Sequence, residues 1–114
     1  MTTQKINFRT NYNNKLACPH FIHLDIAPRN PIPESKLDST VIEIATTDQS
    51  HPPVQKKCVD LARVKFKDVS GIFFYVSHGM TRDQYLQLAA AEKKQITGDT
   101  EMAIYYYSPS DTKL

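Results

Sequence analysis

The chain has 114 residues, with 14 lysines and arginines against 12 aspartates and glutamates, so its formal net charge is only +2. This length fits one domain spanning residues 1–114, which can bury a core without disulfides or a structural metal. The near-neutral balance excludes a bulk electrostatic argument for nucleic acid or an anionic membrane, although it is compatible with a local basic patch.

Targeting and redox features favour a cytoplasmic protein without membrane contact. The first ten residues, MTTQKINFRT, lack the apolar stretch of a signal peptide. No apolar run approaches the roughly 20 residues that a membrane-spanning helix needs. The two cysteines, Cys18 and Cys58, have no Cys-x-x-Cys spacing, so we expect reduced thiols.

Alternation of apolar and polar residues predicts three strands in the first half of the chain. Residues 5–10 place Ile6 and Phe8 on one face, and residues 21–26 and 41–46 repeat this pattern. An asparagine-rich turn follows the first strand, and a proline-rich loop follows the second.

The second half contains two further predicted strands, 54–66 and 101–107. The first of them is long, and its alternation slips near 60–62, which predicts a bulge or a bend. The apolar residues of 69–76 fit helical spacing, although phenylalanine, tyrosine and valine also favour strands; we predict a short helix there. A Thr-x-x-Gln capping box predicts a second helix over 81–94.

This order of elements indicates the fold class. Strands outnumber helices, and strands and helices do not alternate as they do in a doubly wound sheet. We therefore predict an α+β, mainly β, fold: a small barrel of about five strands, closed or nearly closed, with one or two helices at one end.

The second half of the chain resembles ASCH domains, which belong to the PUA-like superfamily. The segments that carry this resemblance are KKCVDLARVKFKDV, SHGMTRDQYLQL and EMAIYYY. ASCH domains have a glycine and a bulky apolar residue before a helix that begins with Ser or Thr. Here Gly79 and Met80 occupy the pair, and Thr81 begins the helix.

The first half departs from the ASCH motif Gly-x-Lys-x-x-Glu-x-Arg. Lys15 matches the motif lysine, whereas Asn13, Cys18 and His20 stand at the glycine, glutamate and arginine positions. The resemblance implies a PUA-like barrel, and some family members bind RNA. Others remove acetyl groups from modified cytidine with a Lys, a Thr and a Glu. Because Cys18 replaces that glutamate, the general acid/base is missing from its expected place.

The segment RTNYNNKLACPHFIHLDI, residues 9–26, concentrates polar chemistry. Cys18, His20, His23 and Asp25 all carry atoms that bind metals, but their spacing fits no common zinc pattern, so we expect no metal and no cofactor. Cys18 beside a histidine also resembles a thiol–imidazole pair, but an inert thiol is the simpler interpretation. His23 and Asp25 share one strand face, where they form either a functional pair or a solvated one.

These residues predict the rim of a binding cleft, with Lys15 as the leading candidate for a phosphate contact and Tyr12 for base stacking. The turn before the second predicted helix forms the opposite wall, where free N–H groups favour anions. The predicted ligand-binding residues are Arg9, Tyr12, Lys15, His20, His23, Asp25, His78 and Arg82.

The sequence thus predicts a small binding module for RNA or a nucleotide-like ligand. One alternative is a small hydrolase acting on modified nucleosides in the same cleft, with His23 and Asp25 in place of the family's acid/base. Another is a protein-interaction module that exposes Phe73, Phe74 and Tyr75. No catalytic residue and no oligomeric state follows from the sequence.

Overall fold

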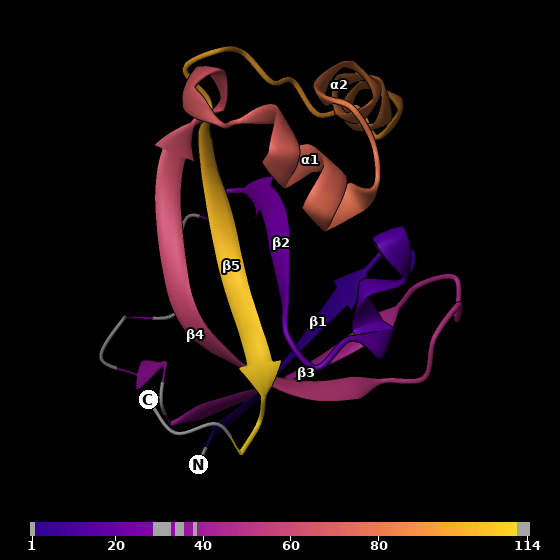
Figure 1. Cartoon of the computed structure of the whole chain (residues 1–114), viewed down its shortest axis with the longest axis vertical. Helices are drawn as coiled ribbons and strands as arrows, with labels where there is room; N and C mark the ends of the chain where they lie inside the picture. Colours follow the sequence, from indigo (N-terminus) through magenta and orange to yellow (C-terminus); the bar gives the residue numbers. More distant parts are fainter. Residues whose placement is uncertain (1, 29–32, 34–35, 38, 112–114) are drawn as a thin grey trace.

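The computed structural model describes residues 2–28, 33, 36–37 and 39–111, which contain a five-stranded sheet and two α-helices (Figure 1). The α+β class is therefore confirmed. The strands are β1 (Thr2–Phe8), β2 (Phe21–Ile26), β3 (Thr40–Thr46), β4 (Val54–Lys65) and β5 (Glu101–Pro109); the helices are α1 (Gly71–His78) and α2 (Arg82–Ala91), and short 3-10 segments form η1 (Tyr12–Ala17) and η3 (Phe66–Asp68).

The sheet has the strand order β1-β3-β4-β5-β2, with β1 parallel to β3 and every other pair antiparallel. In the described part of the chain no backbone ladder joins β1 to β2, so the sheet is not closed and the predicted barrel, closed or nearly closed, is not confirmed. Figure 1 shows β1 and β2 running in different directions. The rings of Phe8 and His23 stack between these two strands with centroids 3.9 Å apart, so side chains occupy the place of a closing ladder.

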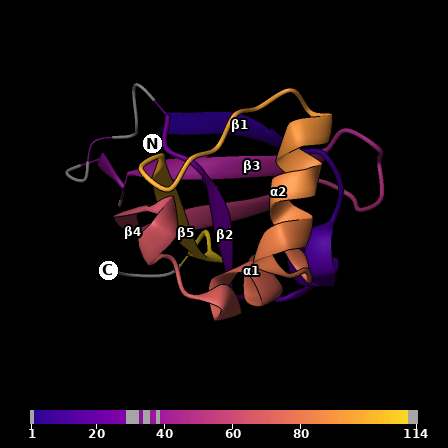
Figure 2. The ribbon, with the colours of Figure 1, turned by 90° about the horizontal axis from the view of Figure 1, so that it is seen from above.

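Figure 1 shows both helices at one end of the molecule, and in Figure 2, seen from above, α2 stands in front of the ends of β1 and β3. The helix prediction for 69–76 holds, with α1 beginning two residues later. The capping box of α2 is also present: the Thr81 hydroxyl accepts from the Gln84 N–H, and the Gln84 side chain accepts from the Thr81 N–H. Helix α2 ends at Ala91 rather than at residue 94, and Lys93 adopts a positive φ of 60°.

The core consists of two clusters of buried apolar residues. One lies between β1, β3 and the start of β2, and includes Phe8, Leu16 and Ile44. The other lies beneath the helices and includes Leu24, Phe74 and Met102, each fully buried. Strand β2 contributes Phe21 to the first cluster and Leu24 to the second, and His23 between them in the sequence is also buried.

The asparagine turn docks η1 onto the end of α1. Asn13 and Asn14 adopt φ angles of 56° and 54°, which asparagine tolerates better than most residues. The Asn13 Nδ2 donates to the carbonyls of Tyr75 and Val76 at 3.2 Å, and satisfies C-terminal carbonyls of the helix. This contact fixes where Lys15 enters the fold.

Two sequence expectations are corrected in detail. The irregularity of β4 lies between Cys58 and Asp60, slightly before the predicted position. Helix α1 buries Phe74 completely and half-buries Phe73; its exposed apolar residues are Ile72, Tyr75 and Val76. Among the described residues, no helix combines the length and apolarity needed to cross a membrane.

Candidate functional site

A pocket of about 110 Å³ opens between β1, β2, η1 and the helices. Ring-bearing side chains form much of its wall, and charged side chains stand at its edge. The lining residues are Asn7, Phe8, Arg9, Tyr12, His23, Asp25, Ile26, His78, Tyr85, Leu88, Ala89, Glu92, Lys94 and Ile96.

The aromatic wall is a continuous series of ring contacts. His23 stacks on Phe8 and lies 5.1 Å from the His78 ring, centroid to centroid. His78 in turn contacts Tyr12 at 4.4 Å and meets Tyr85 edge to face at 5.1 Å. Rings supplied by β1, η1, β2, α1 and α2 therefore hold one another in place before any ligand arrives.

Lys15 lies behind this wall. Its side chain is only 2% exposed, and its Nζ lies 2.6 Å from His23 Nδ1, 2.6 Å from the Ser77 carbonyl oxygen and 3.4 Å from Ser77 Oγ. The Nζ also lies 5.0 Å from the centroid of the Phe8 ring. Burial disfavours the ammonium and lowers the pKa of Lys15 to about 7.

Ser77, fully buried on α1, determines the tautomer of His78. Its Oγ accepts from the Leu24 N–H at 2.8 Å, and when it also accepts from the Lys15 amine at 3.4 Å its own hydrogen is left for His78 Nδ1 at 2.8 Å. Burial lowers the pKa of His78 to about 3, so its imidazole is neutral near pH 7 and carries its hydrogen on Nε2.

Asp25 contributes a half-buried carboxyl group to the pocket. The Ile26 N–H donates to its Oδ1 at 2.8 Å, and this is its one hydrogen bond from the described residues. Burial raises the pKa of Asp25, and this effect outweighs the Ile26 N–H and the nearby lysines, which act in the opposite direction.

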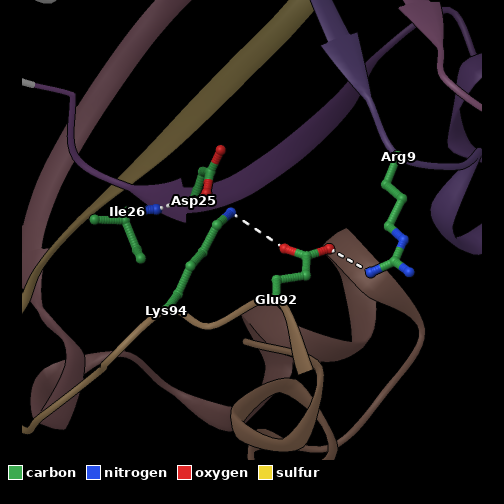
Figure 3. Close-up of polar contacts among 5 residues, drawn as sticks. All are labelled: Arg9, Asp25, Ile26, Glu92 and Lys94. Atoms are coloured by element: carbon green, nitrogen blue, oxygen red, sulfur yellow. Dashed lines mark hydrogen bonds and ion pairs between the residues drawn. The ribbon is translucent and has the colours of Figure 1, made fainter. Parts of the chain in front are cut away.

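The edge of the pocket carries a three-residue ion network (Figure 3). Glu92 stands between Arg9, at 2.8 Å, and Lys94, at 3.2 Å, and Asp25 on β2 lies beside them. The hydrogen bond from Arg9 lowers the pKa of Glu92. Arg9 and Lys94 are thus the two cations at this edge, and Glu92 and Asp25 are the two acidic residues beside them.

The structure brings together five of the predicted ligand-binding residues: Arg9, Tyr12, His23, Asp25 and His78 all line the pocket. The other three lie outside its lining. Lys15 is behind the wall, and His20 contacts Ser108 Oγ at 3.0 Å. Arg82 donates to the Val69 carbonyl and packs over the rings of Phe66 and Phe74.

The sequence analysis missed several site residues. Tyr85 read as part of the apolar face of a helix, and nothing nearby in the sequence links Ser77 to Lys15. Glu92 and Lys94 follow α2 and reach the pocket only through the packing of that helix. Within the described ranges, no three His, Cys, Asp or Glu side chains are grouped so as to hold a metal ion.

No protein-family model and no curated protein matches the sequence. The fold, by contrast, is similar to those of solved structures. An ASCH domain from Lactobacillus crispatus JV V101 aligns over 94% of this chain and 79% of its own, with a TM-score of 0.56. The chain has an ASCH-like fold.

A second solved structure agrees with this assignment. A protein of the DUF984 family from Enterococcus faecalis V583 aligns over 96% of this chain and 76% of its own, with a TM-score of 0.52. Sequence identity to each structure is 9%, so the similarity lies in the fold. The ASCH-like fold accounts for the resemblance in element order, whereas the pocket chemistry rests on this chain's own residues.

Proposed function

We propose that this ASCH-like domain is a small binding module for RNA or a nucleotide-like ligand, and that a base enters the aromatic pocket. The observation that carries the proposal is the ring-lined wall formed by Phe8, Tyr12, His23, His78 and Tyr85. Proteins that bind single-stranded nucleic acid stack unpaired bases on such rings.

The size and charge of the pocket support the same assignment. A volume of about 110 Å³ is comparable with the roughly 150 Å³ cavity that accepts one benzene ring. One ring therefore enters, and the sugar and phosphate stay outside. Arg9 and Lys94 stand at the edge, where a phosphate can compete with Glu92 for them.

The experiment is a titration of the protein with short single-stranded RNA and with the four nucleoside monophosphates at several salt concentrations. Tyr12→Ala should weaken binding by roughly 1–3 kcal/mol, the usual contribution of base stacking. Tyr75→Ala is the matched control, because Tyr75 is 53% exposed on α1 and lies outside the pocket lining. Absence of binding by the wild type at low salt contradicts the proposal.

A hydrolase acting on acylated nucleosides is the second candidate, and Asp25 is the observation that favours it. A carboxyl group with a raised pKa inside a pocket is suited to general acid/base catalysis. Asp25 would take a proton from the water that attacks the acyl carbon, and return it to the amine as the C–N bond breaks. Release of the free nucleoside by the wild type, lost in Asp25→Asn, tests this candidate.

A further inference from the structure

The Lys15 amine has three neighbours that together account for its hydrogens. A charged ammonium has three N–H groups and no lone pair. It therefore donates to the Ser77 carbonyl, to Ser77 Oγ and to His23 Nδ1. In this state His23 Nδ1 is an acceptor, and the neutral imidazole carries its hydrogen on Nε2.

The same geometry also suits a neutral Lys15 amine, if the hydrogen bond between Nζ and His23 Nδ1 runs in the opposite direction. A neutral amine has two N–H groups and one lone pair. The Ser77 carbonyl can only accept, so an N–H remains directed at it, and the second N–H remains near Ser77 Oγ. The lone pair then faces His23 Nδ1 at 2.6 Å and accepts its hydrogen, which leaves Nε2 as an acceptor.

The second ring nitrogen of His23 is accessible to solvent. His23 lines the pocket, and its only hydrogen bond among the described residues is the one through Nδ1. No fully buried side-chain nitrogen or oxygen in the described residues lacks a partner, so Nε2 is accessible to solvent; His23 also lines a second cavity of about 140 Å³ next to the pocket. A ligand that reaches Nε2 therefore meets the ring atom whose polarity Lys15 controls.

We propose that Lys15 is a positioning residue that acts through His23: its protonation decides whether His23 presents a donor or an acceptor to the ligand. The effect on ligand binding rests on the proposed function, whereas the change of tautomer in His23 does not depend on any ligand. His78 provides the internal contrast, because the Ser77 hydroxyl keeps its Nε2 hydrogen in place. The pocket thus combines one constant donor with one group that changes polarity.

The change falls near neutral pH. Burial lowers the pKa of Lys15 to about 7 and keeps the pKa of His23 well below its usual value, so Lys15 is the group of this pair that titrates there. Below this pH His23 donates to the ligand, and above it His23 accepts. The other titratable groups that face the pair are Tyr12 on η1, Asp25 on β2, His78 on α1 and Lys94 after α2.

The direct test uses the protein without ligand. Long-range proton–nitrogen NMR of ¹⁵N-histidine protein reports which ring nitrogen carries the hydrogen, and we follow His23 and His78 from pH 5.5 to 9. The expected result is a transfer of the His23 hydrogen from Nε2 to Nδ1 centred near pH 7, with His78 unchanged. A His23 that keeps one tautomer throughout overturns the proposal.

Lys15→Met provides the second measurement, since it removes both the donor and the lone pair. Its His23 tautomer should not change with pH. For binding, we use the four common ribonucleosides at pH 6 and pH 8.5; wild-type affinity for those that bind should change about tenfold, and that of Lys15→Met should stay constant. If the tautomer changes and affinity does not, the specificity role is wrong. If the tautomer changes and no ribonucleoside binds, the specificity role is wrong while the Lys15–His23 coupling stands, and the titration with RNA and nucleoside monophosphates decides the proposed function separately.

Discussion

Phe8 on β1 and His23 on β2 stack nearly parallel, with ring planes 12° apart, at the place where the two edge strands of the sheet approach each other. The pair also separates two cavities: Phe8 and His23 line both the pocket described above and a second cavity of about 140 Å³ between the strands. A side-chain contact thus joins edges that hydrogen bonds leave open.

Phe8→Ala should therefore lower the free energy of unfolding by about 3–5 kcal/mol, because it removes a buried ring and merges the cavities. Urea denaturation followed by circular dichroism measures this. Ile72→Ala is the control, since Ile72 is 59% exposed on α1, and it should change stability by less than about 0.5 kcal/mol. Equal effects of the two substitutions contradict a structural role for the stack.

Gly79 ends α1 with a φ of 69°, and a Cβ there would lie 3.3 Å from Asn13 Oδ1. Gly79→Ala should cost roughly 1–2 kcal/mol, since other residues pay that penalty in the left-handed region. Gly71→Ala is a matched control at the other end of the helix, where an added Cβ meets nothing within 4 Å. Thermal unfolding of both variants makes the comparison, and a neutral Gly79→Ala would show that the turn relaxes.

Because Lys15 is buried, the free energy of unfolding should change with pH between about 7 and 10.5. Its pKa is about 7 in the folded protein and 10.5 as a free side chain, so the unfolded chain binds more protons between these values. Stability should rise with pH in that window, by about 2 kcal/mol from pH 7 to pH 9. Urea denaturation of wild type and Lys15→Met across this range isolates the effect as the difference in slope. Parallel slopes would show that Lys15 is charged or exposed in the folded state.

Because His78 is buried and neutral, the free energy of unfolding should change with pH between about 3 and 6.5. Its pKa is about 3 when folded and 6.5 as a free side chain, so the unfolded chain takes up the extra proton and stability falls as pH drops below 6.5. The loss attributable to His78 from pH 6.5 to pH 4.5 is about 2 kcal/mol. His78→Phe should remove that part of the slope in denaturation curves, and an unchanged slope contradicts the neutral, buried assignment.

The sequence by itself determined the elements of this protein. Period-two alternation located the strands, and the Thr81–Gln84 capping box located α2, because both signals depend on local backbone geometry. The asparagines before Lys15 correctly indicated a turn, and the ASCH resemblance indicated the architecture. Five of the residues that the sequence grouped around one cleft, Arg9, Tyr12, His23, Asp25 and His78, line one pocket, and their role in binding a ligand stays a prediction.

Only the tertiary structure decided what Lys15 does. A lysine in a polar turn reads as exposed, because burying an ammonium is costly unless partners are supplied. Those partners, His23 and the carbonyl of Ser77, lie 8 and 62 residues away and meet Lys15 only when η1 docks under α1. The open edge between β1 and β2 has the same origin: alternation defines which side chains face inward, whereas the packing of Phe8 on His23 decides whether the backbones can pair.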